Sequence, residues 1–248
     1  DGDPKLFQPL AKPIKERADA YRRQLLDVQG PQLDQVLNLA ELAYRRPFRP
    51  GEREKLQILY QTLRQEEIDH ETALQLVLAR VLVAPAFLYR VEEPAEGEEP
   101  QPVSSWELAS RLSYFLWSSM PDAELRDAAA QGTLADPLVL EAQARRMLAD
   151  PKARAFATEF ACQWLDLRNF DEHNEKSEQT FPEFPALRGA MYEELVQFLL
   201  DLFQRDGSLI EVIDTDHAFL NEALAKHYGI PGVTGDAWRR VDGIKQHD

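Results

Sequence analysis

Cysteine is nearly absent from the sequence, in which Cys162 is the only one among 248 residues. A single cysteine excludes an internal disulfide, a zinc site built on paired cysteines and the Cys-x-x-Cys-His motif that attaches haem covalently. Cys162 itself lies in an apolar segment with helical spacing. A lone cysteine in such surroundings is typically a small buried hydrophobe, since a nucleophile would need a neighbour that stabilises its thiolate.

Long apolar runs and an excess of basic charge are also missing. No stretch approaches the ~18 consecutive apolar residues of a membrane-spanning helix, so we expect no membrane span. The 28 basic and 43 acidic residues give a formal charge of −15, which argues against nucleic acid as a partner, because the phosphate backbone requires a basic surface. Neither a methionine nor a signal peptide opens the chain, which begins at Asp1, so we expect a fragment or processed piece of a longer protein.

The composition that remains is that of a globular protein, with 44% hydrophobic and 29% charged residues. It excludes disorder over the whole chain and supplies a sizeable core. Residues 92–103 differ, because they hold five glutamates, three prolines and no basic residue. Such a stretch neither buries apolar surface nor continues a helix, so it predicts an acidic linker or exposed loop, with a cation-binding loop as the alternative.

Apolar residues recur with the helical period over most of the chain, which predicts an all-α fold of two bundle-like helical domains joined by the linker. We expect a smaller helical domain over 1–91, the linker over 92–103, a larger helical domain over 104–233, and a tail or the start of a following domain over 234–248. The predicted helices span residues 14–28, 32–45, 51–66, 70–84, 137–149, 151–167, 186–205 and 218–228, besides one that starts at Ser104 and a short one that starts at Asp122. Only residues 238–244 suggest a strand.

Several predicted helix boundaries have a chemical signature. Ser104 and Glu107 fit a capping box. Aspartates precede other helices as expected N-caps, two of them followed by proline at the first helical position: Asp69, Asp122, Asp136 and Asp150. At the first helix, Gly30-Pro31 is expected to stop the run. Asp216 is expected to cap the helix over 218–228.

One basic cluster precedes the linker, at Arg45, Arg46, Pro47, Arg49 and Arg53. Arginines at the end of a helix satisfy its last carbonyls and its dipole. We interpret the cluster as making an internal or inter-domain contact, with the acidic second half of the chain as one such surface, in preference to a ligand site.

Metal ligands are signalled only weakly. No histidine pair has the HExxH spacing, and Asp69 and His70 are interpreted as a helix start. Asp214, Asp216 and His217 are dense enough to gather around a cation, but their spacing is not that of the twelve-residue calcium loop. We therefore predict no metal site and keep these three residues as weak candidates.

Catalytic residues stay unassigned. Glu193 and Glu194, with Asp201 further along the same helix, resemble paired carboxylates for acid–base chemistry, but adjacent residues on a helix cannot both face inward. The aromatic residues form either a platform for a sugar or cofactor or, as we favour, part of the core: Trp106, Tyr114, Trp117 and Trp164.

A resemblance to a known family emerges from Arg111-Leu112-Ser113-Tyr114-Phe115-Leu116-Trp117-Ser118 followed by Pro121-Asp122. This block resembles the planctomycete-type multidomain secreted cytochrome c-associated proteins, in a helical domain of unknown function. Residues 31–232 carry the whole resemblance, since the segment with Arg46 and Pro47 resembles the smaller helical domain that precedes it. The matching positions, which look structural, are Arg46, Pro47, Arg111, Tyr114, Trp117, Pro121, Asp122, Arg146, Trp164, Asn221, Tyr228 and Gly229.

The resemblance implies a context for the chain. It implies export to the periplasm or beyond the cell, haem c in flanking domains with no cofactor in this chain, and neighbouring domains of the same protein as partners, with other secreted redox or hydrolytic proteins as further candidates. The function it favours is a non-catalytic helical module that positions redox domains or docks partners. The alternatives are an enzyme domain that acts on an extracellular polymer such as polysaccharide, with electrons passed to the haems, and a protein-binding scaffold without redox context.

Overall fold

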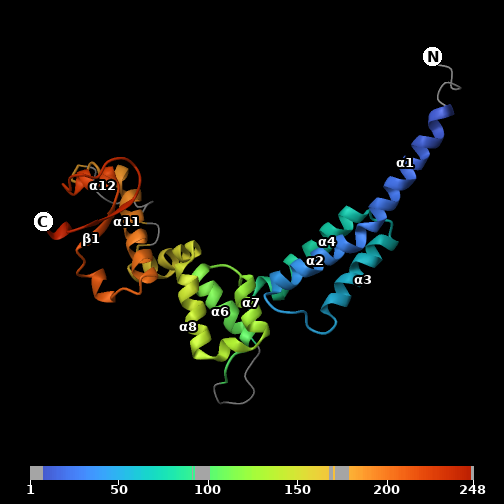
Figure 1. Cartoon of the computed structure of the whole chain (residues 1–248), viewed down its shortest axis with the longest axis horizontal. Helices are drawn as coiled ribbons and strands as arrows, with labels where there is room; N and C mark the ends of the chain where they lie inside the picture. Colours follow the sequence, from blue (N-terminus) through green and yellow to red (C-terminus); the bar gives the residue numbers. More distant parts are fainter. Residues whose placement is uncertain (1–7, 91, 93–100, 168–169, 171–178, 247–248) are drawn as a thin grey trace. The chain divides into compact units, whose positions relative to one another are not determined.

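The computed structural model describes residues 8–90, 92, 101–167, 170 and 179–246, which are mostly helical (Figure 1). The all-α fold class is confirmed. The chain divides into two compact units, Asp1–Trp106 and Glu107–Asp248. Most of the predicted linker, and residues 171–178 of the second unit, lie outside the described residues. None of the described helices combines the length and the apolar character needed to cross a membrane.

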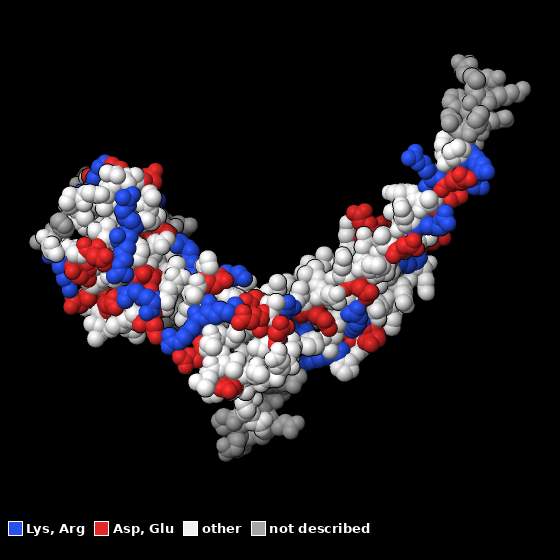
Figure 2. Space-filling view, viewed as in Figure 1, with Lys and Arg blue, Asp and Glu red and all other residues white. Residues whose placement is uncertain are grey.

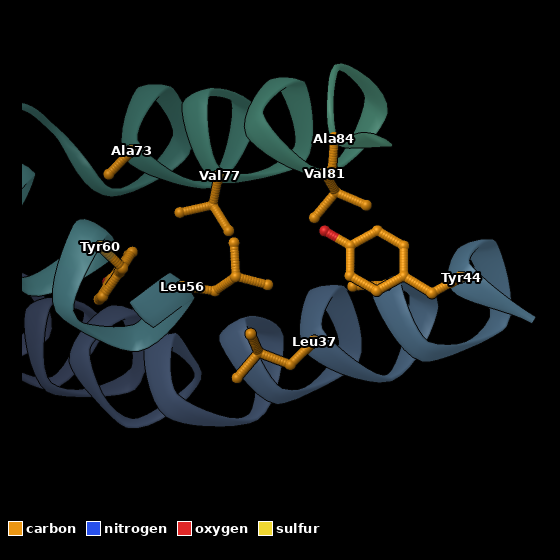
Figure 3. Close-up of a cluster of buried hydrophobic side chains, with 9 residues drawn as sticks. Leu37, Tyr44, Leu56, Tyr60, Ala73, Val77, Val81 and Ala84 are labelled. Atoms are coloured by element: carbon orange, nitrogen blue, oxygen red, sulfur yellow. The ribbon is translucent and has the colours of Figure 1, made fainter. Parts of the chain in front are cut away.

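The first unit is built from helices α1 (Gln8–Asp27), α2 (Gln29–Tyr44), α3 (Glu52–Gln65), α4 (His70–Leu82) and the short α5 (Pro85–Leu88). Its core lies between α2, α3 and α4, where Leu37, Leu56 and Val77 meet (Figure 3). The buried residues of this core recur every three or four positions along each helix, as Leu37, Ala40 and Tyr44 do on α2, so each helix buries a single apolar stripe. The helices predicted at 32–45, 51–66 and 70–84 are confirmed to within a few residues.

The predicted stop at Gly30-Pro31 is wrong. Both residues lie in the first turn of α2, and only Val28 separates α1 from α2. Proline is tolerated in a first helical turn because the N–H it lacks has no partner there. The apolar residues that were expected to form one face of α1 are not buried either: Ile14 and Tyr21 are 63% and 61% exposed.

The second unit begins inside α6 (Ser105–Trp117) and continues with α7 (Ala123–Ala130), the 3-10 turn η2 (Thr133–Ala135) and α8 (Pro137–Ala149). The helix predicted over 151–167 is broken into short pieces, which are η3 (Pro151–Ala153), α9 (Arg154–Phe156), the π-helical η4 (Ala157–Ala161) and α10 (Cys162–Trp164). Cys162 is buried there, as predicted. Four of the predicted N-caps are confirmed, since the side chains of Asp69, Asp122, Asp136 and Asp150 each accept a hydrogen bond from a backbone N–H of the helix that follows.

The C-terminal part holds the long α11 (Phe184–Gln204), η6 (Leu209–Val212), β1 (His217–Leu220), α12 (Glu222–His227), β2 (Arg239–Asp242) and η7 (Ile244–Gln246). β1 and β2 form an antiparallel two-stranded sheet in which His217 pairs with Asp242 and Leu220 with Arg239. The strand predicted in the tail is therefore confirmed as β2. Leu220 and Leu224 pack with Leu187 of α11 in a buried cluster, which fixes the sheet and α12 against the long helix.

The helix predicted over 218–228 is shorter than expected. Its first residues belong to β1, and Asn221, not Asp216, caps α12 by accepting a hydrogen bond from Leu224 N–H. Asp216 instead accepts from the backbone N–H of Lys245, just after β2. The prediction was wrong because the strand forms only through pairing with residues about twenty positions further along, which local periodicity does not reveal.

Candidate binding pocket

A pocket of about 350 Å³ lies in the second unit, where α11, η6, β1, η7 and the C-cap residue of α12 contribute to its walls. Most of its lining is apolar, from Leu167, Phe170, Met191, Leu195, Phe198, Val212, Ala218 and Ile244. The polar side chains of the lining are Tyr192, Glu194, Thr215, His217 and Tyr228. An apolar concavity of this volume with a few polar groups is typical of small-molecule sites.

Glu194 is the carboxyl group of this pocket. It projects from α11 and accepts a hydrogen bond from the Tyr228 hydroxyl at 2.8 Å. Burial raises the pKa of Glu194, although the hydrogen bond from Tyr228 opposes this. No described lysine or arginine forms an ion pair with it. Burial and the nearby carboxyl also raise the pKa of Tyr228, so its hydroxyl is a hydrogen-bond donor at neutral pH.

Tyr228 owes its position to the end of α12. It is the C-cap residue, and Gly229 follows with φ of +71°, a left-handed conformation that costs glycine little. The Ile230 N–H then bonds to the Ala225 carbonyl at 2.8 Å, which closes the helix end. Both residues matched the family resemblance, and their local chemistry brings Tyr228 to Glu194.

The predicted pair of glutamates is split by the helix. Glu193 forms a two-pronged ion pair with Arg154, with N–O distances of 2.9 and 2.5 Å, and also accepts from Gln197. Burial opposes ionisation of Glu193, but the hydrogen bonds from Arg154 and Gln197 outweigh it and lower its pKa. Asp201 pairs with Arg205 and Arg240. Only Glu194 of these three carboxylates lines the pocket.

His217 reaches the pocket from β1 and is 5% exposed. Its Nδ1 lies 2.8 Å from the Thr215 hydroxyl, whereas its Nε2 has no hydrogen-bond partner among the described residues and lies 3.7 Å from Asp201 Oδ2. Burial, followed by the positive charges of Arg240 and Arg205, lowers the pKa of His217. The imidazole is therefore neutral at pH 7 and adds no positive charge to the pocket.

The weak metal candidates do not converge. The Asp214 carboxylate pairs with the Lys245 side chain, Asp216 holds the Lys245 backbone, and His217 faces Thr215. Within the part of the chain that the structure describes, no three His, Cys, Asp or Glu side chains are grouped in a way that would hold a metal ion.

The arginines of the basic cluster make contacts inside the first unit. Arg45 is buried and donates to the carbonyls of Ala86, Phe87 and Tyr89, around the end of α5. Arg46, next to the exposed Pro47, pairs with Glu52, and Arg53 pairs with Asp34. Figure 2 shows basic and acidic side chains interspersed over both units on the face in view.

The aromatic residues of the predicted platform or core have different environments. Trp117 is buried, and its Nε1–H donates to the Met147 carbonyl at 2.8 Å. Trp106 and Tyr114 are partly buried, whereas Trp164 is 63% exposed.

Of the remaining family positions, Arg111 is exposed on α6, Pro121 is buried, and Arg146 pairs with Asp122. Of all the positions that matched the family resemblance, Tyr228 is the one that lines the pocket.

Sequence reasoning missed how the pocket is assembled. Glu194 and His217 were both candidates, but their partners Tyr228 and Thr215 were not linked to them. Tyr228 comes 34 positions after Glu194 and reaches it because α12 returns onto α11. Thr215 comes two positions before His217 and reaches it through the turn before β1. The only signal was that Tyr228 and Gly229 matched the family pattern.

Two family models match the chain. One, described as PSD4, protein of unknown function (DUF1592), matches residues 103–230, and the other, PSD5, protein of unknown function (DUF1595), matches residues 32–92. Comparison with curated proteins and with solved structures gave no significant match. Since the first match covers slightly more than half of the 248 residues, the chain belongs to the DUF1592 family, with a DUF1595 domain preceding it.

Proposed function

We propose that the chain is a non-catalytic helical module of a larger exported c-type haem protein, in which it positions redox domains or docks partner proteins. The observation that carries the proposal is the tandem order of the DUF1595 and DUF1592 domains. It is the order of the two helical domains in the planctomycete-type secreted cytochromes that the sequence resembles.

The contacts of the reactive side chains support a structural role. Asp214 and Asp216 hold Lys245, and Glu193 neutralises Arg154. The thiol of Cys162 is buried, and burial raises its pKa, so the reactive thiolate is disfavoured. These groups stabilise helices and turns through the bonds they already make.

Covalent attachment of haem c does not fit this chain. Covalent attachment of haem c uses two cysteines and a histidine, and Cys162 is both the single cysteine and a buried one. In this proposal the haems are bound by flanking domains, and the helical units set the distance between them.

The reading frame that encodes residues 1–248 provides the first test. We expect it to continue on both sides and to encode Cys-x-x-Cys-His motifs there, behind an export signal. A complete frame that contains these helical units but no such motif would contradict the proposal and would favour a scaffold without redox context.

One observation favours the alternative, an enzyme domain acting on an extracellular polymer. The pocket brings Glu194 and His217, two titratable candidates, into one lining. Triple substitution Glu194→Gln, Asp216→Asn, His217→Ala in the whole protein distinguishes the two functions. Unchanged turnover of a polysaccharide substrate would exclude these residues as catalytic, whereas its loss in a folded protein would support the enzyme.

A further inference from the structure

We propose that the pocket lined by α11, β1, η7 and the C-cap residue of α12 binds a small organic amine, in which a protonated primary ammonium is attached to an apolar aryl or alkyl body. The proposal rests on the pocket alone and is independent of any haem context. It assigns a ligand class to residues that the two family descriptions leave without a role.

The carboxyl of Glu194 supplies the recognition of charge. Its Oε2 accepts one hydrogen bond, from Tyr228, and among the described residues nothing donates to its Oε1. A carboxylate offers about four acceptor sites, so most of the hydrogen-bonding capacity of Glu194 is unused. Partly buried carboxylates are normally paired with a cation, because removing them from water is costly. An ammonium group would supply the missing partner.

The neighbouring carboxylates show what Glu194 lacks. Glu193 is matched by Arg154, and Asp201 is matched by Arg205 and Arg240. In the same unit Asp122 is matched by Arg146. Glu194 differs from all of them because a tyrosine hydroxyl, which carries no charge, is its partner. The structure therefore leaves one negative charge for a ligand at the pocket wall.

The remaining walls suit an apolar body next to that charge. Phe170, Tyr192 and Phe198 contribute aromatic surface, and aromatic faces attract a nearby ammonium as well as apolar groups. A volume of about 350 Å³ lies at the lower end of small-molecule pockets, which suits a phenylethyl or short alkyl group. An anionic ligand is disfavoured, since Glu194 repels it and the neutral His217 adds no positive charge to offset that repulsion.

Calorimetric titration of the full 248-residue chain at neutral pH tests the inference with three probes of similar size. They are 2-phenylethylamine, its neutral analogue 2-phenylethanol and the anion 3-phenylpropanoate. We expect saturable binding of the amine at least about tenfold tighter than that of the alcohol, with the anion weakest. Equal binding of amine and alcohol, preference for the anion, or no saturable amine binding up to about 10 mM would overturn the proposal.

Variants assign the preference to Glu194. Glu194→Gln keeps the size of the side chain and is expected to weaken amine binding by about tenfold while leaving alcohol binding unchanged. Glu183→Gln removes the same charge from an exposed position outside the pocket lining and is expected to leave both unchanged. Circular dichroism verifies that each variant is folded. Equal losses in the two variants would show general electrostatic attraction and would overturn the assignment.

Discussion

Arg146 of α8 and Asp122, the N-cap of α7, form a bidentate ion pair in which Nη1 lies 2.7 Å from Oδ2 and Nη2 lies 3.1 Å from Oδ1. The same Asp122 accepts from Leu125 N–H at 2.9 Å, and the guanidinium of Arg146 lies over the Trp117 ring at 5.6 Å. Burial opposes ionisation of Asp122, but the hydrogen bonds from Arg146 and Leu125 outweigh it and lower its pKa. The Asp122–Arg146 pair, through its contacts with Leu125 and Trp117, therefore joins α6, α7 and α8.

We expect Asp122→Ala to lower the free energy of unfolding by about 2–3 kcal/mol, because it removes both the cap and the ion pair. Asp122→Asn keeps an acceptor for the cap and should cost about half as much. Asp136→Ala is the matched control, since it removes a cap that has no ion pair, and should cost about 1 kcal/mol. Urea denaturation measures all three. Equal costs for Asp122→Ala and Asp136→Ala would show that Arg146 contributes nothing.

Trp117 tests whether the aromatic side chains belong to the core. Its ring is buried, and the charged groups of Arg146 and Lys152 lie 5.6 and 4.5 Å from the ring centroid. We expect Trp117→Ala to cost about 3–5 kcal/mol, and Trp117→Phe, which loses the hydrogen bond to Met147, about 1–2 kcal/mol.

Trp164→Ala provides the comparison for an exposed tryptophan, with an expected cost below about 1 kcal/mol. Thermal and urea denaturation give these values. A cost under about 1 kcal/mol for Trp117→Ala, together with lost ligand binding, would instead identify Trp117 as part of a binding surface.

Arg45 connects α2 to the end of α5 in the first unit. It is buried, has a left-handed backbone with φ of 60°, and its Nη2 donates to Ala86 at 2.7 Å and to Tyr89 at 3.0 Å. We expect Arg45→Ala to cost about 2–4 kcal/mol, and Arg45→Lys about 1–2 kcal/mol, because a lysine cannot reproduce the planar set of donors.

Arg53→Ala is the control for Arg45, since it removes a surface ion pair with Asp34 and should cost no more than about 1 kcal/mol. Urea denaturation of the three variants measures the difference. If Arg45→Ala is as stable as the unmodified chain, the carbonyl contacts of Arg45 do not stabilise the unit.

Glu194 should make stability depend on pH. Because its pKa is raised in the folded state, the folded chain binds more protons than the unfolded chain between the unfolded and folded pKa values. Stability contributed by protonated Glu194 is therefore present below the unfolded value and is lost as pH rises through the folded value. Glu194→Gln does not titrate, so its stability relative to the unmodified chain should increase from about pH 4 to pH 7.

Denaturation of both proteins across this pH range checks the prediction. Tyr228→Phe should make the pH dependence of the glutamate-containing chain steeper, because the Tyr228 hydrogen bond stabilises the ionised carboxyl. A difference between Glu194→Gln and the unmodified chain that is constant with pH, or that decreases, would contradict the account of Glu194.

What the sequence predicts well is local. The caps at Asp69, Asp122, Asp136 and Asp150 depend on residues two or three positions away, so their chemistry is visible in the sequence. The exposed face of α1 was missed because the helical period shows which residues share a face and does not show whether a neighbouring element covers it.

What the sequence hides is contact between distant segments. β1 exists through pairing with β2, and Glu194 gains its partner only when α12 returns to α11. The pairing of Arg146 with Asp122 belongs to the same class, since 24 residues separate the two. Arg146 and Asp122 both matched the family resemblance, and their ion pair gives a physical reason for finding these two residue types at these positions.

The most direct test of the central claim is mass spectrometry, with haem absorbance, on the mature polypeptide isolated from its native cells. We expect covalent haem c on the polypeptide that contains these residues, with every haem-bearing peptide mapping outside residues 1–248. A mature polypeptide without haem, or a haem attached at Cys162, would contradict it.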